Sequence, residues 1–542
     1  MSENLAFDSL VNPYPAARTP IYAKNGMVAT SQPLAANAGL EILKKGGNAV
    51  DAAVATAAAL TVVEPSSNGI GGDGFAIVWM KEKMYGLNAS GPSPQSLTIE
   101  NVKAKGHDKI PKFGWTPVTV PGAPHAWASL VEKFGNLTLS EVLEPAINLA
   151  EEGFPVSPAV SYYWQKSYER FKEDSKGTAT FDEWFKTFTP HDRAPKPGEI
   201  VTLPNHGATL RQIGETNARS FYEGELAEKI AKASEDNDGY ITLDDLKNFK
   251  PEWVTPISVN YRGYDVWEIP PNGQGIVALM ALNTLKGFDI KEKESFETYH
   301  RQFEAMKRAY ISGKHYVTEE SKMSVTTEEL LSESYANQQR SKITDKASDT
   351  EPDLVPAKGG TVYLATADKD GNMVSFIQSN YMGFGSGVVV PDTGIALQNR
   401  GFDFSLDENH ANRLEGGKKS YHTIIPGFLT KSGQAVGPFG VMGGYMQPQG
   451  HVQVIMNTID FQLNPQASLS SPRWQWVEGK TFMVEKEFPT WIAKQLAEAG
   501  HEIKVELEAG NFGRGQIIWR DHETGVLIGG TEDRCDGYIA HY

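Results

Sequence analysis

The feature that most constrains this chain is a change in residue pattern between residues 341 and 380, from a charged stretch to alternating apolar and polar residues. The stretch Ser341–Lys358 is charged and almost free of apolar residues, which is typical of an exposed linker. A diglycine follows, and then Thr361–Ala367 and Met373–Asn380 alternate apolar and polar residues on either side of the turn sequence DKDGN. This pattern predicts a β-hairpin whose first residue is Thr361.

Upstream of the linker the pattern is mixed. Alanine and leucine recur at helical spacing over Ser31–Val63 with a break at KKGGN, which predicts two helices. A glycine loop, Asn68–Gly74, then leads into the apolar run Phe75–Met80, a predicted strand. Residues 120–350 alternate polar loops with helical stretches, among them Ser140–Glu152 and Phe296–Ser312. No repeat of fixed period indicates a solenoid or propeller.

Composition favours a globular protein that binds a small molecule. The chain has 542 residues, of which 40% are hydrophobic and 22% charged, enough for two to four domains by length. A net charge of -16 argues against nucleic acid and anionic membranes as partners. One cysteine, Cys535, excludes an internal disulfide and a cysteine-based zinc cage. The amino-terminal residues lack a secretory pattern, so we expect a cytoplasmic protein.

Two motif matches do not fit their usual context. Gly69–Gly74 reads G-x-G-x-x-G, but the dinucleotide fingerprint lies between a strand and the helix that it opens, whereas here a helix precedes and a strand follows. Ser234–Asp245 resembles a calcium loop, yet its first position is serine and its last is aspartate instead of glutamate. We interpret the first as a tight turn and the second as an acidic turn before a helix.

The junction at Gly360 and Thr361 is the candidate for chemistry. A threonine hydroxyl is a weak nucleophile that needs a base, and its own α-amine, with a reference pKa of about 7.7 to 8.0, serves when threonine opens a chain. Cleavage before Thr361 would create that amine. The preceding glycines permit a strained bend that exposes the Gly360 carbonyl to the Thr361 hydroxyl. A threonine that merely opens a strand after a glycine turn fits the same residues.

Three further blocks of sequence must be considered together with this junction. They are GMVATSQPLAANAGLEILKKGGNAVDAAVATAAALTVVEPSSNGIGGDGF near the start, FYEGELAEKI followed by GYITLDDL in the middle, and Thr361–Gly444. In this order they resemble the γ-glutamyltransferase family (γ-glutamyltranspeptidase, glutathione hydrolase) over nearly the whole chain. The resemblance implies an α/β (α+β) fold of the N-terminal-nucleophile (Ntn) hydrolase type, a four-layer αββα sandwich with two antiparallel sheets flanked by helices. It also implies autocleavage into a large subunit, 1–360, and a small subunit, 361–542, that share one core.

The resemblance assigns catalytic roles by position. Thr361, in GGTVYLATADKDGN, matches the family's nucleophile. Gly443 and Gly444, in GVMGGYMQ, match the glycine pair whose amides stabilise the oxyanion. Ser379 and Asn380, in QSNYMGFGSG, match a hydroxyl and an asparagine near the nucleophile's amine and the substrate, with a one-residue ambiguity in their spacing. Strand-end hydrogen bonding is the alternative role for these last two side chains.

The resemblance also implies substrate-binding residues. Arg400 and Asp403, in LQNRGFDFS, match paired polar and acidic positions, and Asp403 is expected to hold the substrate α-amine. His422 and Thr423 match two small hydroxyl residues that grip the α-carboxylate. Members that process glutathione carry an arginine clamp where this chain has Asn88. A neutral amide cannot form a bidentate, charge-assisted pair with a carboxylate, so we expect Arg400 to supply the missing cation.

The segment between Asp403 and His422 is shorter than in members with a lid loop, which predicts an open site with loose acceptor selectivity. These departures resemble the branch described as γ-glutamyltransferase-like or cephalosporin-acylase-like. The implied function is a self-processing amidohydrolase or acyltransferase that cleaves γ-glutamyl amides through a γ-glutamyl-enzyme intermediate, without a metal or other cofactor. An acylase for glutaryl-like or other amides is one alternative, and an uncut, non-catalytic binding protein is another.

The expected partners follow from the same reading. They are a small γ-glutamyl or acyl amide and the second fragment of the same precursor, with a dimer of such heterodimers left open. Neither nucleic acid nor a membrane is expected.

Overall fold

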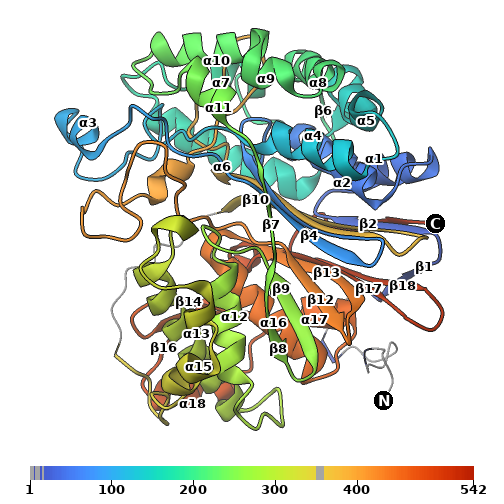
Figure 1. Ribbon diagram of the computed structural model, residues 1–542, viewed down its shortest axis with the longest axis vertical. Coiled ribbons are helices and arrows are strands. Elements are labelled where there is room, and N and C mark those ends of the chain that lie inside the picture. Colours follow the sequence, from blue (N-terminus) through green and yellow to red (C-terminus); the bar gives the residue numbers. More distant parts are fainter. Residues whose placement is uncertain (1–4, 6–12, 15–17, 350–358) are drawn as a thin grey trace.

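Two stacked antiparallel sheets lie at the centre of the molecule in the computed structural model, which describes residues 5, 13–14, 18–349 and 359–542. Figure 1 shows one group of helices above the two sheets and another group below them. The layers therefore run helix, sheet, sheet, helix. This arrangement confirms the predicted αββα sandwich.

The upper sheet of Figure 1 carries the predicted hairpin in its middle. Its strands, in spatial order, are β19 (Tyr538–His541), β2 (Gly26–Thr30), β10 (Gly359–Asp368), β11 (Met373–Met382), β3 (Asp73–Met80), β4 (Lys83–Ala89) and β7 (Glu252–Val254). The hairpin of β10 and β11 is confirmed, although β10 begins before Thr361. The reason is that Gly359 and Gly360 already pair with Met382 and Tyr381 of β11.

The lower sheet faces the upper one. Its strands, in spatial order, are β1 (Ile21–Ala23), β18 (Leu527–Thr531), β17 (Arg514–Arg520), β13 (Gln434–Met442), β12 (Gly427–Lys431), β9 (Tyr264–Glu268) and β8 (Ile257–Tyr261). Apolar side chains of both sheets, including Phe75, Tyr363 and Ile518, are buried between them. Strands from before and after Gly360 are mixed in each sheet, so neither part of the chain has a complete sheet of its own.

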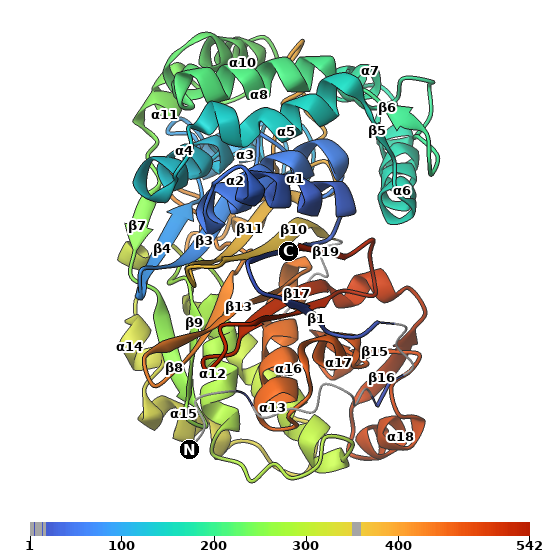
Figure 2. The ribbon, with the colours of Figure 1, turned by 90° about the vertical axis from the view of Figure 1, so that its right-hand side faces the viewer.

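Helices of the upper layer lie beyond the outer face of the upper sheet, some packed directly on it and others further out or to the side (Figure 2). They are α1 (Pro33–Lys44), α2 (Ala49–Val63), α3 (Ile99–Ala104), α4 (Ala123–Phe134), α5 (Leu139–Glu152), α6 (Pro158–Asp174), α7 (Asp182–Phe188), α8 (Pro204–Thr216), α9 (Arg219–Glu223), α10 (Glu225–Glu235) and α11 (Leu243–Asn248). The break predicted between α1 and α2 is confirmed, because Asn48 and Asp51 form a capping box that starts α2. Every residue of α2 is buried, and it packs on β10 and β11, where its alanines allow close approach.

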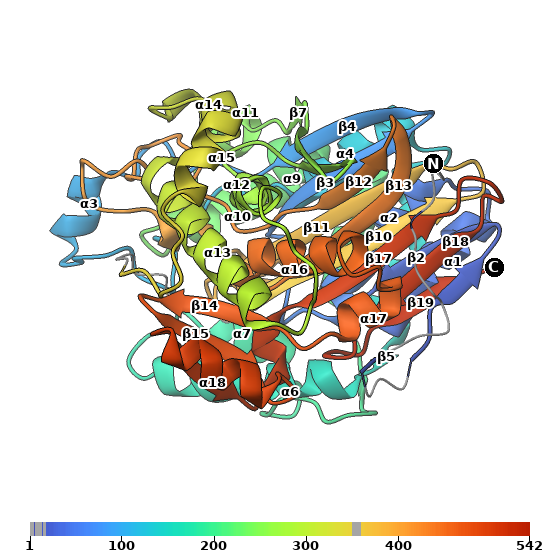
Figure 3. The same ribbon diagram turned by 90° about the horizontal axis from the view of Figure 1, so that it is seen from below.

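Helices of the lower layer cover the outer face of the lower sheet (Figure 3). They are α12 (Gly275–Leu285), α13 (Phe296–Tyr316), α14 (Thr327–Leu330), α15 (Glu333–Arg340), α16 (Gln447–Ile459), α17 (Pro465–Ser470) and α18 (Thr490–Glu498). A small sheet of β14 (Trp474–Glu478), β15 (Thr481–Glu485) and β16 (Glu502–Glu506) lies beside them, and β5 (Phe154–Pro155) pairs with β6 (Ile200–Val201). Within the described residues, no helix is both long and apolar enough to cross a membrane.

Other sequence interpretations have clear outcomes. The glycine loop leads from α2 into β3, so it has the position of a turn and not of a dinucleotide loop. In the calcium-like segment, Asp245 caps α11 through the backbone N–H of Thr242, and Asp236 pairs with Lys232. The linker forms neither helix nor strand over residues 341–349, where it is mostly exposed, and its remaining residues lie outside the described part of the chain.

Candidate active site

Thr361 lies at an irregular point of the central hairpin. Gly360 is opposite Tyr381 but Thr361 is opposite Ser379, so Asn380 is an extra residue in β11. Such a bulge bends the strand and redirects side chains. Tyr381 has φ of 72°, a left-handed conformation that is unusual for a bulky residue and marks local strain. The predicted nucleophile is thus buried in a strand beside a strained bulge.

The Ser379 hydroxyl joins the groups on the two sides of the Gly360–Thr361 bond. Its oxygen lies 2.7 Å from the Gly360 carbonyl oxygen and 2.8 Å from Thr361 Oγ1, and it accepts the backbone N–H of Tyr381. A carbonyl oxygen only accepts hydrogen bonds, so Ser379 donates to Gly360 and Thr361 donates to Ser379. This arrangement polarises the Gly360 carbonyl and keeps the Thr361 oxygen acting as a donor, with its lone pairs available.

The glycine loop before β3 is shaped around Asn380. A Cβ atom at Gly72 would lie 2.6 Å from Asn380 Oδ1, and one at Gly69 would lie 2.8 Å from Asn380 Nδ2. A Cβ at Gly71 would lie 2.4 Å from the carbonyl oxygen of Ala396. These close approaches explain the repeated glycines. The Asn380 amide is fully buried and makes no hydrogen bond to any described residue.

Arg400 and Asp403 form a buried ion pair on the short helix η2 (Arg400–Asp403). Arg400 Nη1 lies 3.3 Å from Asp403 Oδ2 and 2.9 Å from Thr423 Oγ1, and the guanidinium stacks 3.9 Å above the Tyr381 ring. Its Nε and Nη2 have no partner in the described part of the chain. The structure therefore brings together three predicted residues, Arg400, Asp403 and Thr423, and leaves Arg400 with unused donors.

Two tyrosines and a lysine complete this group. Asp403 Oδ1 accepts from the hydroxyls of Tyr381 at 2.7 Å and Tyr445 at 3.0 Å. Lys314, from α13, donates to the Tyr445 hydroxyl. Burial lowers the pKa of Lys314 to about 8, although the Asp403 carboxylate opposes this shift. We call these residues, Arg400, Asp403, Tyr381, Tyr445 and Lys314, the Arg400 cluster.

The Arg400 cluster itself is closed to solvent, whereas the expected openness toward the leaving group stays a prediction. Arg400 is only 1% exposed and the Asp403 side chain 9%. The segment after Asp403 is short, as noted from the sequence, but the rings of Tyr381 and Tyr445 hydrogen-bond to Asp403 from either side. In the continuous chain the cluster is closed by these side chains and not by a lid loop.

His422 faces the glycine loop. Its Nε2 lies 2.9 Å from Asp73 Oδ2, and its Nδ1 accepts the backbone N–H of Ile424. The single proton of the neutral ring is therefore on Nε2 and is donated to Asp73. Burial, reinforced by Arg400, holds the pKa of His422 well below its usual value, and burial raises the pKa of Asp73 to about 7. A role of His422 in gripping a carboxylate stays a prediction.

Gly443 and Gly444 directly follow β13 in conformations that glycine permits, with φ of 141° and 58°. The short helix η3 (Gly444–Met446) packs against β10, which carries Thr361. Gln274 Nε2 donates to the carbonyl oxygens of Gly444 and Thr423 and so ties the diglycine to the substrate-binding segment. This position agrees with the expected oxyanion role, which remains a prediction.

Asn88 is engaged in supporting the loops around β4. Its Oδ1 accepts from the backbone and hydroxyl of Ser90, and its Nδ2 donates to Asn272 Oδ1 at 2.9 Å. Asn272 in turn donates to the Ser420 carbonyl. The described contacts of Asn88 are thus structural, and a role of Asn88 or Arg400 in binding a substrate carboxylate stays a prediction.

Sequence reasoning missed several residues of the site. Tyr381 and Tyr445 directly follow the predicted Asn380 and Gly444, so extending each motif by one residue would have found them. Lys314 lies on a helix without any motif, and only its burial beside Tyr445 identifies it. Asp73 lies inside the loop that we interpreted as a simple turn.

Comparisons with known proteins agree with this geometry. The family model described as gamma-glutamyltranspeptidase matches residues 35–542. A Bacillus subtilis protein named glutathione hydrolase-like YwrD proenzyme is 39% identical over 94% of this chain and 97% of its own length. A Klebsiella pneumoniae protein named oxamate amidohydrolase proenzyme is 33% identical over 96% and 98%. A crystal structure described as cephalosporin acylase from Bacillus halodurans is 60% identical, covers 99% of both chains and has a TM-score of 0.95.

The matched region contains the central hairpin, the Arg400 cluster and the Gly443–Gly444 turn. The sequence resemblance, the αββα sandwich and these comparisons all agree. The chain therefore belongs to the γ-glutamyltranspeptidase family of enzymes.

Proposed function

We propose that the protein is a self-processing amidohydrolase that cuts its own chain before Thr361 and then uses this residue as an amino-terminal nucleophile. The observation that carries the proposal is the Ser379 hydroxyl, which lies within hydrogen-bonding distance of both Thr361 Oγ1 and the Gly360 carbonyl oxygen. The names of the relatives, which include three kinds of proenzyme, support it.

Self-cleavage proceeds by an N-to-O acyl shift. Thr361 Oγ attacks the Gly360 carbonyl carbon, its proton leaves through Ser379, and the C–N bond breaks as the nitrogen of Thr361 takes up a proton. The resulting ester is hydrolysed by one water, which frees the Gly360 carboxylate and the Thr361 hydroxyl. The products are residues 1–360 and residues 361–542, held together by their shared sheets.

Substrate turnover repeats the same chemistry on an external amide. The Thr361 α-amine takes the hydroxyl proton while Oγ attacks the substrate carbonyl, and the amides of Gly443 and Gly444 stabilise the oxyanion. The proton passes to the leaving amine as the C–N bond breaks, which leaves an acyl ester on Thr361. Water, or a second amine in transfer, then attacks the ester, gives its proton to the α-amine and releases the acyl group.

We assign the substrate as a γ-glutamyl amide. In this assignment the α-carboxylate meets the free Nε and Nη2 of Arg400 and the Thr423 hydroxyl, and the α-ammonium meets Asp403. Glutathione is one amide of this class, but the neutral Asn88 in place of the family arginine makes Arg400 the principal cation for the carboxylate.

A second candidate is an acylase for glutaryl-like amides, which lack the α-amine. One observation favours it: Asp403 already accepts from Arg400, Tyr381 and Tyr445, so little of its charge is left for a substrate ammonium. The 60% identity to the structure described as cephalosporin acylase points the same way.

One pair of substrates separates the candidates. γ-Glutamyl-4-nitroanilide and glutaryl-4-nitroanilide share a leaving group and differ only in the α-amine. For a γ-glutamyl enzyme, Asp403→Asn lowers kcat/KM about tenfold or more on the first and much less on the second, because only the first contains a charge that pairs with Asp403. An acylase shows an unchanged ratio. Activity of Thr361→Ala on either anilide contradicts Thr361 as the nucleophile. An uncut wild-type chain without activity contradicts the proposal and favours a binding protein.

A cytoplasmic location and a dimer of processed heterodimers are further parts of this proposal. Cell fractionation tests the first, and sedimentation of the processed protein tests the second.

A further inference from the structure

A cavity of about 380 Å³ lies beside Gly443, outside the Arg400 cluster. Its volume falls in the range of about 300–1,000 Å³ that is usual for small-ligand sites. Its walls come from Ser66 and Ser67 after α2, from α6, from Gly383 after β11, from Gly443, and from the loop around η4 (Ala509–Phe512). Figure 2 shows α6 and the β15–β16 region at the same side of the molecule.

The cavity and the Arg400 cluster share two segments of the chain, one after β11 and one after β13. In the first, Tyr381 belongs to the cluster and Gly383 lines the cavity. In the second, Tyr445 belongs to the cluster and Gly443 lines the cavity. If the cluster binds the acyl group, as the proposed function states, this neighbouring cavity, which Gly443 also lines, is available to the departing amine.

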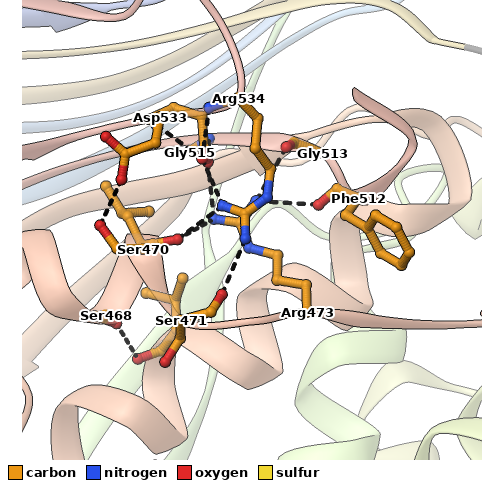
Figure 4. A network of polar contacts seen from close by, with 12 residues as sticks. Ser468, Ser470, Ser471, Arg473, Phe512, Gly513, Gly515, Asp533 and Arg534 are labelled. Carbon is orange, nitrogen blue, oxygen red and sulfur yellow. Dashed lines mark hydrogen bonds and ion pairs between the residues drawn. The ribbon is translucent and has the colours of Figure 1, made fainter. Parts of the chain in front are cut away.

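The outer wall of this cavity is held rigidly. Arg473 Nη1 donates to the carbonyl oxygens of Phe512 and Gly513, both at 3.0 Å, and its Nη2 pairs with Glu532 at 2.8 Å. Arg534 joins the network through Glu485 and Glu532. Figure 4 shows the side chains of Arg473 and Arg534 close together, with Phe512 and Gly513 beside them. A wall fixed by buried, charge-assisted bonds keeps the cavity formed without a ligand.

One cation of the cavity lacks a carboxylate. Lys166 pairs with Glu508, and Arg514 pairs with Glu64 at 3.0 Å. Arg170, in contrast, donates to the Gly383 carbonyl at 3.2 Å and stacks on Phe113 and Phe171, but forms no ion pair with a described residue.

The acidic groups near Arg170 do not neutralise it. Glu506, the other carboxylate of the lining, accepts the backbone N–H of Glu508. Burial lowers the pKa of Arg170, and Asp174, one turn further along α6, opposes this shift only through space. A half-buried arginine that pairs with no carboxylate of the described residues, beside an empty volume, is suited to bind an anion.

We propose that this cavity binds the amine portion of the substrate, both as leaving group and as acceptor, and that Arg170 selects amines that carry a carboxylate. Amino acids, peptides and β-lactam nuclei all have this chemistry. The inference rests on the proposed function, and it makes Arg170 a specificity residue on the amine side.

The test compares two leaving groups on one acyl group. The wild-type enzyme is assayed with the 4-nitroanilide and the 3-carboxy-4-nitroanilide of whichever acyl group it hydrolyses faster. We expect it to prefer the carboxylated anilide through a lower KM. Arg170→Ala then loses about tenfold or more of kcat/KM on the carboxylated anilide, while the neutral anilide and self-cleavage stay unchanged.

Further variants make the result specific. Arg170→Gln keeps the stem that packs on Phe113 and Phe171, and is expected to lose the preference as well, whereas Arg170→Lys retains part of it. Arg193→Ala removes the same charge from an exposed pair with Glu199 and leaves the preference intact. An unchanged ratio of the two anilides in Arg170→Ala and Arg170→Gln overturns the inference and leaves the proposed function standing. A wild-type protein that hydrolyses neither anilide contradicts both.

Discussion

The Arg400 cluster and the amine-side cavity are built in different ways. The Arg400 cluster is buried, and its charges and hydroxyls are bonded mainly to one another. The amine-side cavity has an empty volume, an exposed ion pair between Lys166 and Glu508, and an arginine, Arg170, that forms no ion pair with a described residue. A network of buried charges is costly to disturb, whereas exposed pairs contribute little. If both proposals hold, the acyl side is fixed by a closed network of its own bonds, whereas selection on the amine side depends mainly on one charged group, Arg170.

The largest effect is expected from breaking the Arg400 cluster. Asp403→Ala removes the carboxylate that Arg400, Tyr381 and Tyr445 share, and leaves a buried guanidinium unpaired. We expect a loss of about 3–5 kcal/mol in the free energy of unfolding. Urea unfolding at pH 7 measures it, in a Thr361→Ala background so that each sample is one uncut chain. Asp403→Asn, which still accepts from the tyrosines, is the milder control. A change below about 1 kcal/mol for Asp403→Ala contradicts the described network.

A second prediction concerns the Gly360–Thr361 bond. Ser379→Ala removes the hydroxyl that joins Thr361 to the Gly360 carbonyl, and we expect self-cleavage to slow about 10- to 100-fold. Denaturing gels over time after synthesis give the rate. Ser375→Ala is the matched control, because Ser375 lies on the same strand and bonds to Tyr363 instead. Equal rates for the two variants would remove Ser379 from the mechanism.

The pH dependence of stability tests the burial of Lys314. Its folded pKa of about 8 lies below the ordinary value of 10.5, so between these values the unfolded chain binds more protons than the folded one. As pH falls toward about 8, the unfolded chain takes up a proton on Lys314 before the folded chain does, so the folded state loses stability. Wild type is therefore expected to gain about 1–2 kcal/mol relative to Lys314→Met as pH rises from 8 to 10. Parallel curves for the two proteins contradict this assignment.

The smallest effect is expected at the amine-side cavity. Lys166→Ala removes an ion pair with Glu508 whose side chains are 41% and 31% exposed. Such pairs contribute about 0–1 kcal/mol, so stability and turnover of the neutral anilide change little. Thermal unfolding and kcat/KM check this. A loss of unfolding free energy as large as that of Asp403→Ala would contradict the difference between the cluster and the cavity.

The parts of the fold that were predictable are those set by local sequence. The capping residues Asn48 and Asp51, the alanine spacing and the DKDGN turn act within a few residues, so α1, α2 and the hairpin of β10 and β11 follow from them. The hairpin also brings Ser379 opposite Thr361. The bulge at Asn380 could not be predicted, because the alternation of apolar and polar residues does not show where one strand contains an extra residue.

The rest of the site depends on contacts between distant segments. Lys314 reaches Tyr445 from another helix, and Arg170 reaches the cavity from α6, without any motif around either residue. Asp403 was found only through a family resemblance, which gave its position but not the tyrosines that surround it. The closed state of the Arg400 cluster likewise comes from packing and not from the length of the loop after Asp403.

The central claim is that Thr361 acts as the first residue of a chain. Intact-mass analysis with amino-terminal sequencing of the purified, active protein tests it directly. We expect two fragments, with about two-thirds and one-third of the chain's mass, the smaller beginning Thr-Val-Tyr, and a single uncut chain for Thr361→Ala. Full activity in a protein whose Gly360–Thr361 bond is intact would contradict the account.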